Sequence, residues 1–278
     1  MASNPAIEHV VLIIKENHGF DNYFGTLAGA NGFSMPRSPN PPTHDPDHRH
    51  EAWLTRQTTA VKLQFVEQDI PAYFAYARRF TLCDNYFTDV AGPSTPNHLM
   101  LIAGDSPIID NPPGYRLAPG AGPWNLPSLP SQLEQVNLTW RNYGGYAFDF
   151  ITGLKGRNKR LSAQFAADAS VGNLAAIFVT WDDWGGWFDH VNPLEVETWK
   201  PDGSQFRYGS RVGCLAISPD AKTGHVSHEL NSHVSLLKFC ETLFGLPALN
   251  ARVGNAQGMA DCFDWTRTPA APPGTILV

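Results

Sequence analysis

The amino-acid sequence predicts an α/β layer structure. Three apolar runs, at residues 8–14, 175–181 and 212–219, are continuous rather than alternating, which is the pattern of strands buried on both faces of a sheet. Two stretches with apolar residues at helical spacing, at 70–80 and 234–244, supply helices that can cover such a sheet. No linker or internal repeat divides the chain, so we expect a single domain spanning residues 1–278.

The predicted elements follow one another along the chain. The first strand leads into a loop at 29–47 that is rich in glycine, proline and serine. The helix at 70–80 has Pro71 near its start, where the missing N–H costs nothing. A second loop rich in proline and glycine follows at 110–127.

The second half of the chain begins with a short helix at 128–137 and a strand with a turn at 138–145. The strands at 175–181 and 212–219 come next. The helix at 234–244 is followed by a glycine and then a proline, which are the usual signals for the end of a helix.

Composition excludes several classes of protein. Of the 278 residues, 42% are hydrophobic and 17% are charged, which is typical of a globular protein. The net charge is −6 and the 20 Lys and Arg residues form no basic run, so we expect no nucleic-acid partner. No apolar run approaches the roughly 20 residues that span a bilayer, so we expect no transmembrane segment. The first residues lack the basic and apolar regions of a secretory signal. The cysteines form no CxxC pair, and we interpret them as buried or paired structural residues: Cys83, Cys214, Cys240 and Cys262.

Polar side chains come directly after two of the predicted strands. Glu16 and Asn17 come directly after the first strand, and Asp182 and Asp183 come after a later one, with the proline-flanked hydroxyl segment GPSTPN at 92–97 between them. In open α/β sheets, ligands bind at the carboxyl ends of strands, so we expect these residues to converge. Their oxygen atoms suit a hard or borderline divalent cation. Taken singly, each pair has a plainer interpretation as a solvated turn or a helix cap.

Four longer stretches together resemble the bacterial phosphoesterase family, which contains non-haemolytic phospholipases C and acid phosphatases. They are HVVLIIKENHGFDNYFGTL, FTLCDNYFTDVAGPSTPNHLMLIAGDS, IFVTWDDWGGWFDHVNP and YGSRVGCLAISPDAKTGHVSHELNSHVSLLKFCETLFGLPALNAR. The resemblance implies an α/β, alkaline-phosphatase-like sandwich with a mostly parallel central sheet flanked by helices. It also implies a phosphoric-ester hydrolase that acts on a phosphate ester or a phospholipid, and it suggests an exported protein.

The resemblance assigns metal ligands and a nucleophile. The family motif ENxSFDxYFG matches Glu16 and Asn17 as metal ligands. The motif GP[ST]xPN places the nucleophilic hydroxyl at Ser94, which is also expected to bind the metal, with Thr95 as the fallback nucleophile. The bound cofactor is expected to be one divalent ion, either Ca²⁺, Mn²⁺, Mg²⁺ or Zn²⁺. The implied reaction is attack of Ser94 on phosphorus, with a phosphoseryl intermediate that water hydrolyses.

The remaining candidates come from two further motifs and a histidine-rich segment. The motif D[DE]xGGxxDHV makes Asp182 and Asp183 further metal ligands, and a DPxH element makes His48 the residue that faces the phosphate and protonates the leaving alcohol. His44 and His50 are interpreted as ordinary loop histidines. Possible contacts with substrate, or supports of the site, are Asn97, Asp189, His190, His228 and His233.

The chain departs from the family pattern before the strand at 175–181. The resemblance implies a longer connection there, with a histidine–proline element, whereas residues 162–174 run directly into the strand. An internal deletion is therefore expected, and it raises an alternative function: a weak or inactive family member that binds phosphate-containing ligands. A sulfatase would need an arginine in a C/S-x-P-x-R context, which the segment STPNH lacks.

Overall fold

A computed structural model describes residues 7–161, 164, 175–198, 205–266 and 268–269. Its centre is a six-stranded sheet in the order β1–β5–β8–β2–β10, with β9 also paired to β2. The strands are β1 (His9–Lys15), β5 (Ala175–Trp181), β8 (Arg211–Ile217), β2 (Thr81–Phe87), β10 (Asn231–Ser232) and β9 (His225–Ser227). β8 is antiparallel to both of its neighbours, while the other pairs in this sheet are parallel. The prediction of a mostly parallel sheet flanked by helices is confirmed.

The two strands that carry polar residues at their ends lie side by side. β1 and β5 pair in parallel over their whole length, from His9 opposite Ala175 to Lys15 opposite Trp181. The ladder continues one step beyond the strands, because the backbone N–H of Asp182 donates to the carbonyl of Lys15 at 3.0 Å. The residues that follow the two strands therefore leave the sheet next to each other.

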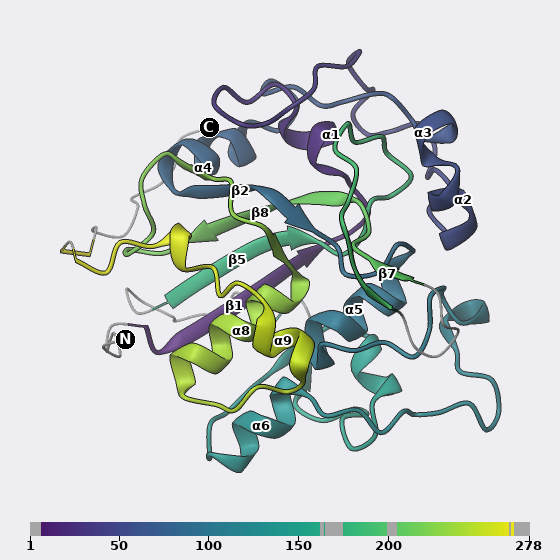
Figure 1. Cartoon of the computed structure of the whole chain (residues 1–278), viewed down its shortest axis with the longest axis vertical. Helices are drawn as coiled ribbons and strands as arrows, with labels where there is room; N and C mark the ends of the chain where they lie inside the picture. Colours follow the sequence, from purple (N-terminus) through teal and green to yellow (C-terminus); the bar gives the residue numbers. More distant parts are fainter. Residues whose placement is uncertain (1–6, 162–163, 165–174, 199–204, 267, 270–278) are drawn as a thin grey trace.

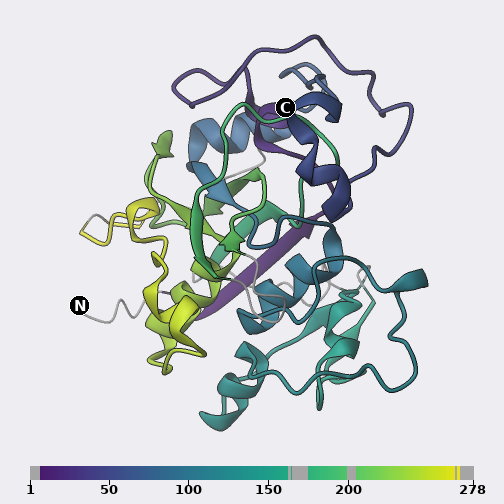
Figure 2. The ribbon, with the colours of Figure 1, turned by 45° about the vertical axis from the view of Figure 1, so that its right-hand side comes forward.

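Helices cover both faces of the sheet (Figures 1 and 2). α1 (Phe20–Phe24) and α4 (Pro71–Arg79) lie on one face, and α5 (Ser94–Ala103) and α8 (His233–Phe244) lie on the other. α6 (Leu129–Gln135) packs against α5, and α9 (Ala251–Asn255) packs against α8. The remaining elements are α2 (His50–Leu54), α3 (Arg56–Thr59), the strand pairs β3 (Asn142–Tyr143) with β4 (Lys159–Arg160) and β6 (Glu195–Thr198) with β7 (Gln205–Arg207), and 3₁₀ turns at Pro113–Tyr115, Ala147–Phe150 and Ala260–Cys262.

Most of the predicted elements are confirmed, within one or two residues at their ends. The predicted strand at 138–145 is reduced to the two residues of β3. β2 and α5 were not predicted, although both contribute to the central layers. All four cysteines are buried and none forms a disulfide. Within the described residues, no helix combines the length and apolar character needed to cross a bilayer. Apart from residue 164, the predicted join at 162–174 lies outside the described residues.

Aromatic side chains anchor α1 to the sheet. Phe20 and Phe24 are completely buried. The ring of Trp181, at the end of β5, lies 4.6 Å from the ring of Tyr23 and 5.9 Å from that of Phe24, centre to centre. Gly213 in β8 leaves room for two of these rings, since a Cβ atom at this position would lie 2.7 Å from Phe24 Cε2 and 3.2 Å from Trp181 Cζ3.

Replacing Gly213 with alanine is expected to lower the free energy of unfolding by about 1–3 kcal/mol, because the added methyl group overpacks the core. Gly254→Ala in α9 is the matched control, since its Cβ would meet only Ala248 Cβ at 3.4 Å. We expect that variant to be as stable as the parent or up to about 1 kcal/mol more stable, because alanine favours a helix. Urea denaturation of the two variants measures the difference, and equal stabilities would contradict this packing.

Candidate active site

The candidate site lies where β1 and β5 end, and two tight turns build it. Asn17 adopts a left-handed conformation, with a φ of 61°, and its backbone N–H donates to Asp182 Oδ1 at 3.1 Å. Gly185 has a φ of 60°, and a Cβ atom there would lie 1.9 Å from the carbonyl oxygen of Asn17. Only glycine permits this approach, so the turn after β5 locks against the turn after β1.

Ser94 is the first residue of α5 and points at these turns. Its Oγ donates a hydrogen bond to Asp183 Oδ2 at 3.0 Å and lies 3.4 Å from Asn17 Oδ1. The loop ahead of Ser94 is held by Asn97, whose side-chain amide donates to the carbonyl of Val90 at 3.1 Å and whose Oδ1 accepts from the N–H of Val90 at 2.8 Å. Asn97 therefore positions the loop that carries Ser94.

The neighbouring hydroxyl of Thr95 is engaged elsewhere. Its Oγ1 lies 2.9 Å from the hydroxyl of Tyr146, and its backbone N–H donates to Asn111 Oδ1 at 2.7 Å. Ser94 is thus the hydroxyl that contacts the carboxylate of Asp183.

The two adjacent aspartates are completely buried, and their pKa values move in opposite directions. Burial, together with the charge of Asp182, raises the pKa of Asp183 well above its usual value. Burial acts in the same sense on Asp182, but contact with His98 and the hydrogen bonds that Asp182 accepts together outweigh it, and the pKa of Asp182 is lowered. Two buried carboxylates this close do not both ionise readily without a compensating positive charge.

His98 also belongs to the site, although it was not predicted from the sequence. It lies one helical turn after Ser94 on α5, and its Nε2 atom is 3.5 Å from both Glu16 Oε1 and Asp182 Oδ2. Burial alone would lower the pKa of His98, but the two carboxylates raise it to about 10. The signal in the sequence was the spacing of Ser94 and His98, which places both on one face of a helix.

The residues of this site fit a metal ion. The three ligand atoms of Glu16, His98 and Asp182 lie within 4.8 Å of one another. His98 Nε2 and Asp182 Oδ2 are buried, and neither has a hydrogen-bond partner among the described residues. The side chain of Glu16 is 61% exposed, so the cluster opens to solvent on one side.

Asp189 and His190 belong to a separate charge network. Arg211, which is completely buried, donates from Nε to Asp189 Oδ1 and from Nη2 to Asp21 Oδ1, each at 3.1 Å. His190 Nδ1 lies 2.7 Å from the other oxygen of Asp21. Although these acidic groups and His190 are also close enough to share an ion, the guanidinium already supplies the positive charge.

Two predicted histidines lie behind or beside the site. His233 is completely buried; its Nε2–H donates to the backbone carbonyl of Asp182 at 2.8 Å, and its Nδ1 accepts from Tyr86 at 3.1 Å. It therefore supports Asp182 from within the protein. His228 is largely exposed, and its Nδ1 lies 2.8 Å from Asp84 Oδ1.

His48 and His50 lie where the loop after α1 leads into α2. His48 donates from Nδ1 to the carbonyl of Pro46 at 2.8 Å, and in the described part of the chain none of its hydrogen bonds reaches Ser94 or the carboxylates. Its role as the acid stays a prediction. His50, interpreted as an ordinary loop residue, donates from Nδ1 to the carbonyl of Ala91 at 2.6 Å and so braces the loop ahead of Ser94.

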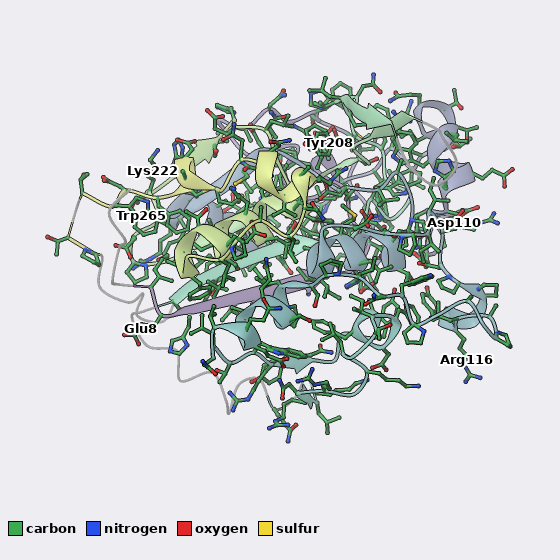
Figure 3. All side chains as sticks on the ribbon, turned by 60° about the horizontal axis from the view of Figure 1, so that its bottom comes forward. Glu8, Asp110, Arg116, Tyr208, Lys222 and Trp265 are labelled. Atoms are coloured by element: carbon green, nitrogen blue, oxygen red, sulfur yellow. The ribbon has the colours of Figure 1, made fainter. Side chains whose placement is uncertain are left out.

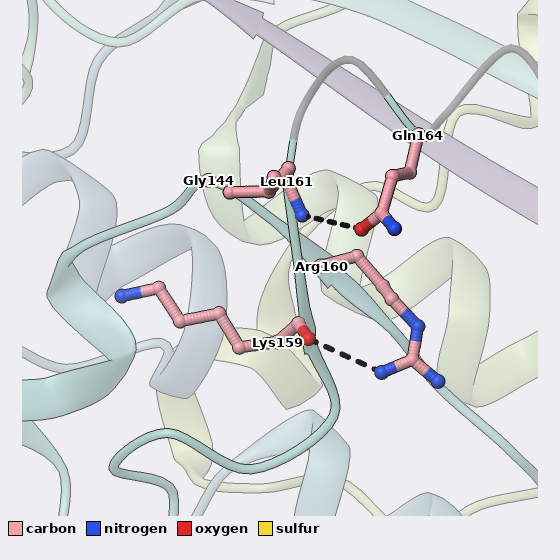
Figure 4. A pocket seen from close by; sticks show the side chains of 5 residues that line it. All are labelled: Gly144, Lys159, Arg160, Leu161 and Gln164. Atoms are coloured by element: carbon pink, nitrogen blue, oxygen red, sulfur yellow. Dashed lines mark hydrogen bonds between the residues drawn. The ribbon is translucent and has the colours of Figure 1, made fainter.

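Figure 4 draws a pocket that none of these site residues lines. It is lined by Gly144, Lys159, Arg160, Leu161 and Gln164. None of them belongs to the cluster around Ser94, so this pocket is not part of the candidate active site.

A family model described as the Phosphoesterase family matches residues 7–51, 43–170 and 159–247. The chain belongs to the phosphoesterase family. The second and third matched parts meet at 159–170, directly ahead of β5, where the sequence indicates a missing segment.

Several curated proteins are similar to this chain. Phospholipase C B of Mycobacterium tuberculosis is 24% identical over 96% of this chain and 78% of its own length. The non-hemolytic phospholipase C of Pseudomonas aeruginosa is 24% identical over 86% of this chain and 54% of its own length. The hemolytic phospholipase C of the same organism is 28% identical over 50% of this chain and 26% of its own length. The alignment with phospholipase C B runs over 418 positions, more than the 278 residues of this chain, so that relative has segments without a counterpart here.

Proposed function

We propose that this phosphoesterase hydrolyses phosphoric esters in a metal-dependent reaction, of the phospholipase C or acid-phosphatase type, with Ser94 as the nucleophile. One observation carries the proposal: Ser94 Oγ donates to Asp183 at 3.0 Å, at the point where the carboxylates of two strand ends meet. Membership of the phosphoesterase family supports ester hydrolysis as the reaction class.

Each residue of the site has a role in the proposed reaction. Asp183 orients the hydroxyl of Ser94 toward an incoming phosphorus atom. Ser94 begins the ten-residue helix α5, whose N-terminal end favours the negative charge of a phosphoryl group. Attack by Oγ forms a bond to phosphorus while the hydroxyl proton passes to Asp183. The bond from phosphorus to the alcohol breaks, with His48 as the proposed donor of a proton to the leaving oxygen, and water then hydrolyses the phosphoseryl group and releases the product.

The residues that would hold a divalent ion are Glu16, Asn17, Asp182 and Asp183, with Ser94 beside them. Such an ion supplies positive charge to the nucleophile and to the transferring phosphoryl group. Until it is bound, the paired aspartates share too much negative charge for both to ionise, which agrees with the raised pKa of Asp183.

A second function has a specific observation in its favour. Phospholipase C B has segments that this chain lacks. If those segments contain the expected histidine–proline element, this chain lacks part of a substrate site. The chain would then bind phosphate-containing ligands with weak turnover or none.

The test is hydrolysis of p-nitrophenyl phosphate and p-nitrophenyl phosphorylcholine by purified protein, first stripped of metal and then resupplied with Ca²⁺, Mn²⁺, Mg²⁺ or Zn²⁺. We expect turnover to disappear on stripping and to return with at least one ion, and the preferred ester distinguishes a phosphatase from a phospholipase C. A folded sample that binds inorganic phosphate but hydrolyses neither ester would favour the binding function.

A further inference from the structure

We infer that His98 is a nitrogen ligand of the divalent ion at this site, and that the site therefore prefers a borderline transition-metal ion such as Zn²⁺ over Ca²⁺ or Mg²⁺. The inference builds on the proposed function, because it concerns the same ion. An imidazole nitrogen suits zinc and its neighbours, whereas calcium and magnesium take oxygen ligands.

The distances match those between two ligands of one ion. His98 Nε2 is 3.5 Å from Glu16 Oε1 and 3.5 Å from Asp182 Oδ2. Two atoms that each lie about 2.1 Å from a tetrahedral zinc ion are about 3.4 Å from each other. The same separation is long for a hydrogen bond between nitrogen and oxygen, which is typically about 2.9 Å.

Two buried atoms in this cluster lack partners. His98 Nε2 and Asp182 Oδ2 are both buried without a hydrogen-bond partner in the described part of the chain, and they face each other across the 3.5 Å gap. Buried polar groups of native proteins are normally paired with protein, water or an ion, so this pair of atoms indicates a ligand between them.

The imidazole is held in place by its surroundings. Its ring lies 5.5 Å from the ring of Tyr146, centre to centre, and the hydroxyl of Tyr146 is fixed by Thr95 at 2.9 Å. α5 thus presents Ser94 and His98 to the site from one rigid element.

The second acidic cluster provides an internal comparison. There, Arg211 lies between Asp21 and Asp189 and balances their charge. In the described structure, by contrast, the ion pairs of Glu16 and Asp182 are made with His98 alone. One imidazole between two carboxylates leaves the cluster short of positive charge, and a divalent ion bound to neutral His98 would supply it.

The experiment loads metal-free protein with Zn²⁺ and records the X-ray absorption spectrum at the zinc edge, together with the dissociation constants for Zn²⁺ and Ca²⁺. We expect imidazole scattering in the wild-type spectrum. His98→Gln should lose that scattering and bind Zn²⁺ at least about tenfold more weakly, since even residues that support a ligand change metal affinity by 10- to 100-fold. The wild-type protein should also bind Zn²⁺ more tightly than Ca²⁺.

His98→Cys adds a positive test, because a thiolate ligand would introduce a sulfur scatterer at about 2.3 Å from zinc. His225→Gln is the matched control. His225 also pairs with a carboxylate, Asp261, at 2.8 Å, but its strand β9 lies beside Thr81, at the opposite end of β2 from the site. Asp110 lies on the site side, because it accepts from the backbone N–H of His50, which braces the loop ahead of Ser94. Figure 3 shows Lys222, another partner of Asp261, on the opposite side of the molecule from Asp110.

Three results would overturn the inference: a wild-type zinc spectrum without imidazole, unchanged Zn²⁺ affinity in His98→Gln, or tighter binding of Ca²⁺ than of Zn²⁺. The first needs no variant, so it holds even if a substitution prevents folding. Imidazole scattering without ester hydrolysis would leave the ligand assignment intact and refute the proposed function. Hydrolysis by a protein whose zinc spectrum lacks imidazole would refute the ligand assignment and leave the proposed function intact.

Discussion

Replacing Ser94 with alanine is expected to lower the rate of phosphoester hydrolysis by at least about 10³-fold, because the reaction loses its nucleophile. Ser94 is 3% exposed, its hydroxyl donates to Asp183, and the loop ahead of it is held by Asn97. The missing atom is small, so the circular dichroism spectrum and the unfolding midpoint should change little. Steady-state kinetics with the preferred p-nitrophenyl ester measures the loss.

Thr95→Val is the matched variant for the neighbouring hydroxyl. It removes the contact with Tyr146 and leaves the contact of Ser94 with Asp183 in place. We expect its rate to fall far less than that of Ser94→Ala. If Ser94→Ala were active and Thr95→Val inactive, the nucleophile would have to be reassigned to Thr95.

The largest loss of stability is expected for Arg211→Met, at about 3–5 kcal/mol of unfolding free energy, because the change leaves buried carboxylates without their counter-charge. Arg211 is completely buried, and its Cζ atom lies 4.2 Å from the centre of the Phe20 ring. Its Nη1 donates to the carbonyls of Asn31 and Asp84 at 2.8 Å, in addition to the contacts with Asp21 and Asp189. One guanidinium therefore ties together β8, β2, α1 and the loop after β5.

Guanidinium chloride denaturation compares this variant with Arg78→Met. Arg78 is 55% exposed and pairs with Glu67 at the surface, so its loss should cost no more than about 1 kcal/mol. The effect of Arg211→Met should also depend on pH. Burial raises the pKa of Asp189 to about 6 even though Arg211 opposes it. Without Arg211 that pKa lies higher still, so as the pH falls toward 6 the variant binds a proton at Asp189 before wild type does. The difference in stability should therefore shrink as the pH approaches 6 and level off below it. Equal losses for the two arginines would contradict the account of this network.

The sequence was most informative where a single strand or motif determines the structure. The apolar runs that became β1 and β5 predicted buried strands, and the polar residues after them predicted that Glu16, Asn17, Asp182 and Asp183 would converge. The full parallel register of β1 with β5 brings this about. The left-handed conformation of Asn17 and its contact with Gly185 could not be predicted, because each turn adopts its conformation against the other.

The missed features depend on long-range contacts. β2 reads TLCDNYF, and its polar Asp84 and Asn85 interrupt the apolar pattern, so it did not stand out as a strand. α5 begins inside a segment with two prolines, which the sequence alone presents as a loop. Once α5 is recognised, His98 falls on the same face as Ser94. Arg211 could not be identified either, because β8 is antiparallel and brings its first residue, rather than its last, to the edge of the sheet where the site lies.

The most direct test of the central claim is to quench the protein during turnover and map its phosphorylated or phosphoryl-ester-bearing peptides by mass spectrometry. We expect a covalent group on Ser94 in wild-type protein supplied with the activating metal, and no such group in Ser94→Ala. Sustained hydrolysis with the group on another residue would contradict the assignment of Ser94 as the nucleophile.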